Sequence, residues 1–247
     1  MNLILLKPSD FVSDSVVRID DFRFEHIKNV LKLKNGDFLK AGLLNDKIGT
    51  GKICEIGEKS VSFSVILDKN PPKENPAILF CAMPRPKVFR RVLLNAVCFG
   101  VKEIHFFHSF KVEKSYWQSP FLQEKSINEI VENGLSQAVD TIVPKIYFHK
   151  QFKPFVEDVF AEIAKTRPCF VFHPCENSVR TRLALSGADD GEDKASRVLT
   201  NGIVIGTEGG FTDYEIGLFA KNNAQIVSLG ERILRVEQAV CAVLAPC

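Results

Sequence analysis

The amino-acid sequence predicts an α/β protein in which a small β-rich domain precedes a larger domain built on a largely parallel sheet. From Ala77 onward, apolar strand-like runs alternate with helical patterns, which is typical of a parallel sheet covered by helices. Before residue 68 the apolar runs are short and separated by turn residues. A proline-rich stretch lies between the two patterns. We therefore predict a barrel at residues 1–70, a linker at 71–76 and an α/β domain at 77–247.

The first domain is expected to be a compact barrel, because its strands are short and only one helical pattern interrupts them. Such barrels often bind nucleic acid. The helical pattern is the spacing of Phe24, Ile27, Val30 and Leu31, while Gly49 and Gly51 indicate a bend. The expected strands are Leu3–Leu6, Val16–Ile19, Phe38–Leu43, Thr50–Ile56 and Val61–Leu67.

In the second domain, turn and capping residues mark the ends of the expected elements. Gly100 is expected to end the first helix, and Ser119 with Pro120 to begin a helix that runs to about Val139. Residues 212–215 form a capping box that begins another helix. The expected strands are Ala77–Ala82, Val101–Phe107, Val143–Phe148, Cys169–His173, Val198–Ile205 and Ile226–Ser228; further helices begin near Val88, Pro154 and Val236, and residues 185–197 are expected to form a hydrophilic loop.

Charge is unevenly distributed along the chain. The net charge is only +2, yet residues 77–125 carry eight Lys or Arg against three Asp or Glu. A basic stretch of this kind is typical of a surface that binds a polyanion, although a solvated helix surface is an equal alternative.

Several other functions are disfavoured by composition. The seven cysteines are scattered without a Cys-x-x-Cys pair, which indicates reduced thiols in the cytoplasm. Cys169, His173 and Cys175 lack the fourth ligand of a zinc site, so we expect no metal. Neither a membrane-spanning run nor a signal peptide is expected.

Two glycine-containing segments follow buried strand-like runs near the end of the chain. One is the segment Gly206-Thr207-Glu208-Gly209-Gly210, and the other begins at Leu229-Gly230. Sheets of this class bind ligands at the carboxyl ends of their strands, so a binding site is predicted there, with a plain tight turn as the alternative. The usual dinucleotide, phosphate-loop and nucleophile-elbow motifs are absent from the sequence.

The segments Ile205–Phe211 and Leu229–Glu237 together resemble the signature pair of the RsmE family. These proteins are S-adenosylmethionine-dependent 16S ribosomal RNA uracil-N3 methyltransferases of the SPOUT superfamily. The resemblance covers nearly the whole chain: residues 26–37 are similar to the family's PUA-like barrel, and Ala82–Lys87 to the opening of its catalytic domain.

The resemblance implies a SPOUT domain with a trefoil knot, preceded by a PUA-like β-barrel. It also implies S-adenosyl-L-methionine as cofactor, 16S ribosomal RNA as substrate, a homodimer formed through the knot domain, no membrane association and a cytoplasmic location. The cofactor contacts that it implies are His173, Pro174, Ile205, Gly206, Glu208, Gly209, Gly210, Leu229, Gly230, Ile233, Leu234 and Arg235.

Uracil N3 must lose a proton before it can accept a methyl group. A carboxylate near the methyl group, or an arginine that stabilises the anionic base, would therefore be catalytic; Glu208, Arg235 and Glu237 are the candidates. Helix capping, mutual pairing and a place in the dimer contact are equally weighted alternatives for these three residues.

A second group of residues is expected to contact RNA. Tyr116 and Trp117 lie within a basic segment and suit base stacking, although a buried tryptophan that anchors a loop is slightly favoured. The expected RNA contacts are Lys28, Lys32, Lys34, Arg85, Lys87, Arg90, Arg91, Lys111 and Lys114.

The chain departs from the family pattern at several positions. Thr207 stands where a proline is typical, Gln238 where a threonine is typical, and residues 136–140 lack an arginine. Asn2 and residues 85–91 also differ from the common pattern. Because the cofactor loops are nearly intact while several presumed RNA-side positions have changed, we expect a divergent branch with an altered RNA target. Two alternatives remain open: methylation of another RNA atom, such as a ribose 2′-hydroxyl, and a non-catalytic RNA-binding or ribosome-assembly factor.

Overall fold

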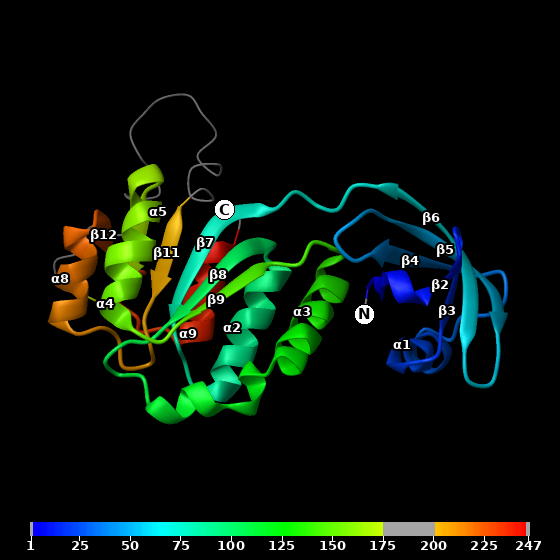
Figure 1. The fold of residues 1–247 in the computed structure, drawn as a ribbon, viewed down its shortest axis with the longest axis horizontal. Coiled ribbons are helices and arrows are strands. Elements are labelled where there is room, and N and C mark those ends of the chain that lie inside the picture. Colours follow the sequence, from blue (N-terminus) through cyan, green and yellow to red (C-terminus); the bar gives the residue numbers. More distant parts are fainter. Residues whose placement is uncertain (1, 175–200, 246–247) are drawn as a thin grey trace. The chain divides into compact units, whose positions relative to one another are not determined.

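The computed structural model describes residues 2–174 and 201–245, which fall into two compact units (Figure 1). The N-terminal unit comprises Met1–Lys73 together with Val131–Val143, and the C-terminal unit comprises Glu74–Ile130 and Pro144–Cys247. The predicted fold class, a small curled β unit followed by a parallel-sheet α/β unit, is confirmed.

Six strands of the described chain form the curled sheet of the N-terminal unit, in the order β1-β4-β5-β6-β3-β2. The prediction missed β2, a short strand of mostly exposed residues that shows no apolar alternation. The bend predicted at Gly49 and Gly51 is wrong, because both glycines lie inside β5. A Cβ atom on Gly49 would lie 1.9 Å from the Ile66 carbonyl oxygen, so close strand approach requires this glycine. The strands are β1 (Ile4–Leu6), β2 (Phe11–Ser13), β3 (Val16–Ile19), β4 (Phe38–Leu43), β5 (Ile48–Ile56) and β6 (Val61–Lys69).

The helical segment of this unit closes one side of the curled sheet. α1 (Phe22–Glu25) continues directly into a π-helical turn, η2 (His26–Val30), and the segment ends at Lys32, whose φ is +53°. Phe24 and Ile27 are buried with the inward-facing strand residues, so the predicted apolar spacing marks the core face of this segment. A single short 3-10 turn, η1 (Pro8–Asp10), joins β1 to β2.

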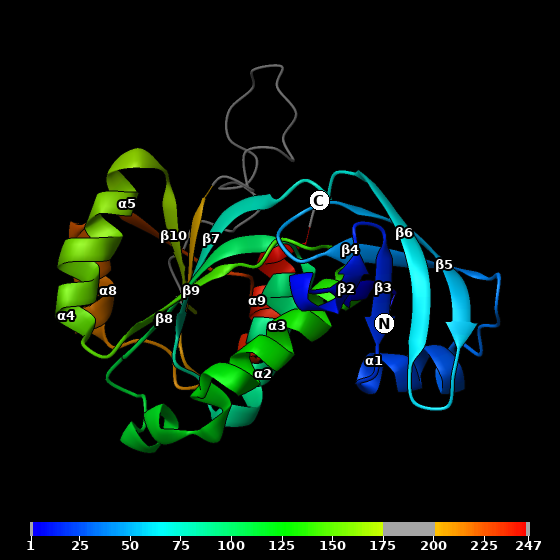
Figure 2. The same cartoon turned by 45° about the vertical axis from the view of Figure 1, so that its right-hand side comes forward.

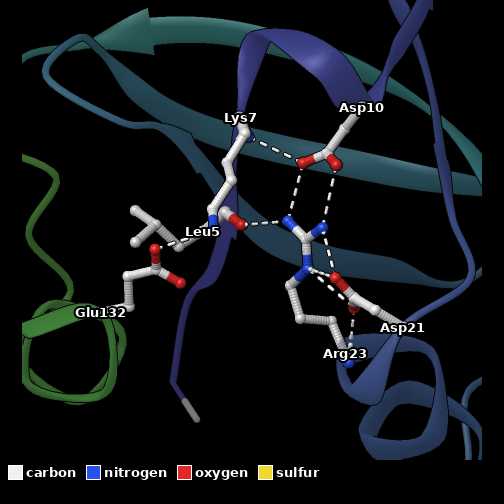
Figure 3. A network of polar contacts seen from close by, with 6 residues as sticks. All are labelled: Leu5, Lys7, Asp10, Asp21, Arg23 and Glu132. Carbon is white, nitrogen blue, oxygen red and sulfur yellow. Dashed lines mark hydrogen bonds and ion pairs between the residues drawn. The ribbon is translucent and has the colours of Figure 1, made fainter. Parts of the chain in front are cut away.

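A buried arginine ties this unit together (Figure 3). The Arg23 guanidinium donates to both carboxylate oxygens of Asp10 at 2.7 and 2.9 Å, to Asp21 at 2.7 Å and to the Leu5 carbonyl oxygen at 2.6 Å. Burial alone would lower the pKa of Arg23, but the hydrogen bonds and charges of the two aspartates outweigh it and raise the pKa. The buried charge is therefore compensated, which is the condition for such a group to be tolerated.

A segment from the middle of the chain completes the N-terminal unit. The Ser136 carbonyl oxygen accepts from the backbone N–H groups of Asn2 and Leu3 at 3.1 and 3.0 Å. The Thr141 carbonyl oxygen accepts from the Asn45 N–H at 2.8 Å, and Lys7 forms an ion pair of 2.8 Å with Glu132 (Figure 3). Residues 131–143 thus supply partners for backbone groups at the edge of this unit.

The C-terminal unit contains a sheet in which the described strands are all parallel, in the order β12-β10-β11-β7-β8-β9. The strand predictions are confirmed apart from their ends, although residues 198–200 of the expected Val198–Ile205 strand and the loop at 185–197 lie outside the described residues. The strands are β7 (Asn75–Ala82), β8 (Val101–Phe107), β9 (Lys145–His149), β10 (Cys169–Phe172), β11 (Gly202–Ile205) and β12 (Ala224–Val227).

Helices cover both faces of this sheet (Figures 1 and 2). On one face, Phe80 packs with Phe155, Phe160 and Phe219 in a cluster of aromatic rings. On the other face, α2 (Pro86–Cys98) packs against α9 (Val236–Leu244). The remaining helical elements are α4 (Phe152–Pro154), η5 (Phe155–Phe160), α5 (Ala161–Thr166) and α8 (Asp213–Lys221) on the first face, with η3 (Lys114–Gln118), η4 (Pro120–Leu122) and α3 (Glu124–Ala138) after β8.

Two helix boundaries show how the capping signals operate. The Thr212 capping box is confirmed, because Thr212 Oγ1 accepts from the Glu215 N–H while Glu215 accepts from the Thr212 N–H at 2.8 Å. The α-helix expected to begin at Ser119 is wrong in its start: Ser119 caps only the 3-10 turn η4, and α3 begins at Glu124. Gly100 has a φ of +77°, as expected for a residue that ends a helix.

Candidate functional site

The ends of three adjacent parallel strands meet at one edge of the sheet. Phe172 at the end of β10 is in register with Ile205 of β11 and with Val227 of β12. The three segments that follow these strands therefore begin side by side, as the arrangement of an α/β ligand site requires.

A cavity of about 630 Å³, including its open mouth, lies between these segments. Its lining includes all but two of the residues predicted to bind the cofactor, the exceptions being Gly209 and Arg235. The lining residues are Phe172, His173, Pro174, Ile205, Gly206, Thr207, Glu208, Gly210, Ser228, Leu229, Gly230, Arg232, Ile233, Leu234, Val236 and Ala239.

Sequence reasoning did not assign six of these residues to the cavity. Ser228 and Arg232 are adjacent in sequence to residues that were predicted to bind the cofactor. Val236 and Ala239 lie one turn apart on α9. The spacing of three residues on the first turn of a helix was the available signal, because such residues share a face.

The glycine loop after β11 is held in a defined shape. The Gly210 N–H donates to the Thr207 carbonyl oxygen at 2.9 Å, and Gly210 has a φ of +69°. A Cβ atom on Gly206 would lie 3.2 Å from the Phe211 ring, so this position has little room for a side chain on that side. The loop then ends at the Thr212 cap of α8.

The loop after β12 uses its own glycine for a tight reversal. Gly230 has a φ of +118°, and its N–H donates to Ser228 Oγ at 3.2 Å while its carbonyl oxygen accepts from the same hydroxyl at 3.1 Å. Ile233 and Leu234 follow at the rim of the cavity and are 84% and 37% exposed. Apolar side chains in this position can cover a bound ring.

His173 contributes a buried polar atom to the cavity. Within the described part of the chain, its Nδ1 is buried and has no hydrogen-bond partner. Burial and the positive charge of Lys111 lower the pKa of His173, with Asp213 acting in the opposite direction. The imidazole is therefore neutral at pH 7, and its buried nitrogen can bind one polar atom of a ligand.

The three catalytic candidates occupy different environments. Glu208 is exposed, lines the cavity, and accepts from the Arg85 N–H at 3.3 Å. Glu237 lies on the first turn of α9 and forms a 3.2 Å ion pair with Arg91, its side chain 15% exposed. Arg235 is the exposed residue that precedes α9, and its N–H donates to Gln238 at 3.2 Å.

Six of the predicted RNA contacts lie in the C-terminal unit. Arg85, Lys87, Arg90 and Arg91 lie on or just before α2 and are exposed. A hydrogen bond with Tyr116 raises the pKa of Arg85, which keeps this side chain charged. Lys111 donates to the Gly209 carbonyl oxygen at 2.6 Å, whereas Lys114 begins η3. Basic side chains thus surround the start of α2 and the glycine loop.

The remaining predicted contacts lie in the N-terminal unit. Lys28, Lys32 and Lys34 are exposed, and the Lys28 ammonium lies 5.1 Å from the centre of the Phe24 ring. Trp117, in the C-terminal unit, is half-buried and donates to His108 Nδ1 at 3.0 Å. This bond favours the reading of Trp117 as a loop anchor.

Neither a metal centre nor a membrane-spanning helix is present among the residues that the structure describes. Among residues 2–174 and 201–245, no group of three or more His, Cys, Asp or Glu side chains is placed to hold a metal ion; Cys175 lies outside those ranges. In the same ranges, no helix has both the length and the apolar character needed to cross a membrane.

Comparison with known proteins defines the class to which this fold and cavity correspond. The family model described as an RNA methyltransferase domain matches residues 71–246, and the one described as an RNA methyltransferase PUA domain matches residues 19–66. The chain is thus built as an RNA methyltransferase domain preceded by a PUA domain.

Relatives narrow this class further. Ribosomal RNA small subunit methyltransferase E of Treponema pallidum is 30% identical over 250 residues, covering 99% of this chain and 90% of the relative. A Borreliella burgdorferi protein, ribosomal RNA small subunit methyltransferase E 1, is 26% identical and covers 98% and 95% of the two chains. The chain belongs to the ribosomal RNA small subunit methyltransferase E family.

A solved structure supports the fold. The Neisseria gonorrhoeae ribosomal RNA small subunit methyltransferase E, a crystal structure bound to S-adenosyl methionine, superposes with a TM-score of 0.71 at 18% identity. The match covers 99% of this chain and 95% of that one, so both units have counterparts in it.

Proposed function

We propose that this protein transfers a methyl group from S-adenosylmethionine to N3 of a uridine in small-subunit ribosomal RNA. The observation that carries the proposal is the cavity at the ends of β10, β11 and β12, in a chain whose family acts as RNA methyltransferases. The N-terminal unit and the basic start of α2 are proposed to hold the RNA.

The lining of the cavity fits such a cofactor. Gly206, Gly210 and Gly230 leave backbone groups uncovered by side chains, which suits close approach to a planar base and an amino-acid moiety. The buried Nδ1 of His173 needs a polar partner that a ligand can supply. Leu229, Ile233 and Leu234 would cover the apolar part. When bound, the cofactor supplies a methyl group already activated on a sulfonium.

The chain's own contribution is then positioning and proton removal. Positioning of two reactants contributes roughly 7–11 kcal/mol in favourable cases. We assign proton removal from N3 to Glu208, because its carboxylate lines the cavity and is exposed. Arg235 is proposed to stabilise the resulting anionic base from the start of α9. Glu237, already paired with Arg91, is proposed to fix α9 against α2 as a positioning residue.

Two substitutions separate these roles. Because a general base typically contributes at least a hundredfold, we expect Glu208→Gln to lower kcat by roughly that factor or more while cofactor affinity is kept. Glu237→Gln should instead lower the melting temperature and reduce activity only modestly. The assignment fails if Glu208→Gln retains the full rate constant of methyl transfer in single-turnover assays.

The function as a whole is tested in two steps. Calorimetric titration with S-adenosylmethionine should show binding by the purified protein, and Gly210→Val, at a glycine that lines the cavity, should abolish it in a protein that remains folded. Nucleoside mass spectrometry of ribosomal RNA from a deletion strain should then show the loss of one 3-methyluridine. An unchanged 3-methyluridine content with loss of a 2′-O-methyl nucleoside would indicate the other reaction, and absence of cofactor binding would indicate a non-catalytic factor.

Three further properties are proposed from the family resemblance. The C-terminal unit is proposed to be knotted, to pair with a second copy, and to act in the cytoplasm on ribosomal RNA. Light scattering of the purified protein should give the mass of a homodimer, and a monomer at micromolar concentration would contradict the proposed pairing with a second copy.

A further inference from the structure

A tight turn directly after β8 presents one aromatic side chain to solvent. The Val112 N–H donates to the Ser109 carbonyl oxygen at 2.9 Å, and both of these residues are buried. Phe110 and Lys111 therefore occupy the two central positions of the turn. The Phe110 side chain is 81% exposed.

Two polar contacts fix the turn, one to the first turn of α8 and one to the glycine loop. The Phe110 N–H donates to Glu215 Oε1 at 2.8 Å, and Glu215 itself is only 1% exposed. The other carboxylate oxygen of Glu215 accepts from the N–H and the hydroxyl of Thr212 at 2.8 and 3.0 Å. From the neighbouring position, the Lys111 ammonium donates to the Gly209 carbonyl oxygen at 2.6 Å. A buried carboxylate and a lysine thus hold the turn against the loop that lines the cavity.

Single exposed apolar side chains are common on protein surfaces, so the exposure of Phe110 alone decides nothing. Its surroundings are more specific. The backbone is held by a buried charged group, Lys111 lies next to the ring's own residue, and Arg85 contacts Glu208 of the same glycine loop through its N–H at 3.3 Å. An exposed aromatic ring on a fixed backbone, directly before a lysine in the sequence, is an arrangement with which proteins bind unpaired bases.

We propose that Phe110 is a base-stacking residue that holds an unpaired base of the RNA substrate beside the cavity, while Lys111 and Arg85 contact adjacent phosphates. This rests on the proposed function and deepens it by naming how the RNA strand is positioned. Methylation of N3 requires the target nucleotide to leave its paired or stacked position, and a neighbouring stacking surface compensates for the lost base stacking. Stacking reads no hydrogen-bonding edge, so Phe110 would position the strand without selecting its sequence.

Steady-state methylation of small-subunit ribosomal RNA tests the proposal. Loss of one stacked base by alanine substitution typically weakens binding between about fivefold and a hundredfold, so we expect Phe110→Ala to raise the KM for RNA by roughly tenfold. Its affinity for S-adenosylmethionine should stay unchanged, and Phe110→Tyr should restore the KM. Tyr214→Ala is the matched control, because it removes another exposed aromatic ring, 62% exposed, from α8 rather than from the turn. An unchanged KM in active Phe110→Ala overturns the proposal.

A second measurement decides the question independently of catalysis. The chain has one tryptophan, Trp117, so the added fluorescence of Phe110→Trp can be read against the parent protein. Single-stranded RNA should quench this added signal, and absence of quenching overturns the proposal. If the parent binds RNA but transfers no methyl group, the proposed function fails while quenching still supports stacking. If Phe110→Ala instead converts a dimer to a monomer in light scattering, the ring is a protein contact and the proposal is wrong.

Discussion

Arg23 illustrates how one residue can organise the N-terminal unit. Its guanidinium joins the turn η1, the strand β1 and the start of α1 through Asp10, Leu5 and Asp21. The guanidinium charge is buried, and it forms ion pairs with the carboxylates of Asp10 and Asp21. For Asp21, burial would raise the pKa, but the hydrogen bonds and charge of Arg23 outweigh burial and lower it.

We predict that Arg23→Met destabilises the protein by about 3–5 kcal/mol, because removal of one partner leaves buried carboxylate charge uncompensated. Urea denaturation followed by circular dichroism measures the change. Arg18→Met on β3 is the matched control, since Arg18 is exposed and its loss should change stability by less than about 0.5 kcal/mol. Equal effects of the two substitutions would show that the network does not stabilise the unit.

Glu215 shows what sequence reasoning can and cannot find at this scale. The capping box was predictable, because Thr212 and Glu215 have the required spacing in the sequence. The bond from the Phe110 N–H to the same carboxylate was not, because residues 105 positions apart carry no periodic relation. The same reasoning explains Glu237: its sequence context suggested a place facing the substrate base, whereas its pairing with Arg91 depends on the packing of α9 against α2.

The loops after β11 and β12 were predictable as elements because glycines follow buried strands directly. Their detailed shapes differ, however. Gly230 has open space around its Cβ position but a φ of +118°, so backbone conformation rather than crowding requires glycine there. Gly209 has no positive φ of this kind, and a Cβ atom there would lie 3.0 Å from Lys111 Cδ, so a substitution would require the lysine side chain to move.

We expect Gly230→Ala to weaken binding of S-adenosylmethionine by roughly tenfold or more, because a side chain at this φ costs about 1–3 kcal/mol and the loop would relax away from its present shape. Calorimetric titration measures the affinity. Gly217→Ala, in α8 with no atom within 4 Å of its Cβ position, should leave the affinity unchanged. Full affinity in Gly230→Ala would mean that this loop does not form the pocket.

The pairing of β8 with β9 contains a chain of titratable groups. His105 Nδ1 lies 2.9 Å from His149 Nε2, and His105 Nε2 lies 2.9 Å from Glu103, with Tyr147 stacked on the His105 ring and Phe155 packed against both imidazoles. Burial lowers the pKa of His105 more than Glu103 raises it. Burial and the neighbouring His105 lower the pKa of His149 to about 4.

These shifts predict a loss of stability in mild acid. The unfolded chain takes up protons below the ordinary histidine pKa of 6.5, whereas the folded chain resists them until the pH approaches the lowered values. The stability that the lowered histidine pKa values contribute is therefore complete above pH 6.5 and falls as the pH decreases toward about 4. Melting temperatures measured from pH 7 to pH 4.5 should fall less steeply in His149→Gln than in the parent. Parallel curves would contradict this assignment.

At the scale of the whole molecule, the fold class and most strands followed from alternation and turn residues. The set of chain segments that make up the N-terminal unit could not be predicted in this way. The first part of residues 131–143 has the periodicity of a helix. Such periodicity indicates that one face of the helix is buried, but it does not indicate which part of the chain covers that face. Nothing local therefore indicated that Val131–Val143 belong with Met1–Lys73.

This division predicts that a fragment of residues 1–73 is incomplete. Without residues 131–143, the N–H groups of Asn2, Leu3 and Asn45 lose their carbonyl partners, and Gly42 loses its contact with Thr141. Each lost hydrogen bond contributes about 0.5–1.5 kcal/mol, and the loss of residues 131–143 also exposes the buried side chain of Leu3. We therefore expect the fragment to melt well below the intact protein.

Addition of a synthetic peptide of residues 131–143 should raise the melting temperature of the fragment, and the increase should grow roughly with the logarithm of the peptide concentration, as expected for a ligand that binds only the folded state. A peptide in which Ser136 and Thr141 are replaced by proline is the control, since proline disrupts the helix and the following segment. A fragment that melts cooperatively at the temperature of the intact unit without any peptide would show that residues 131–143 lie against this unit without stabilising it.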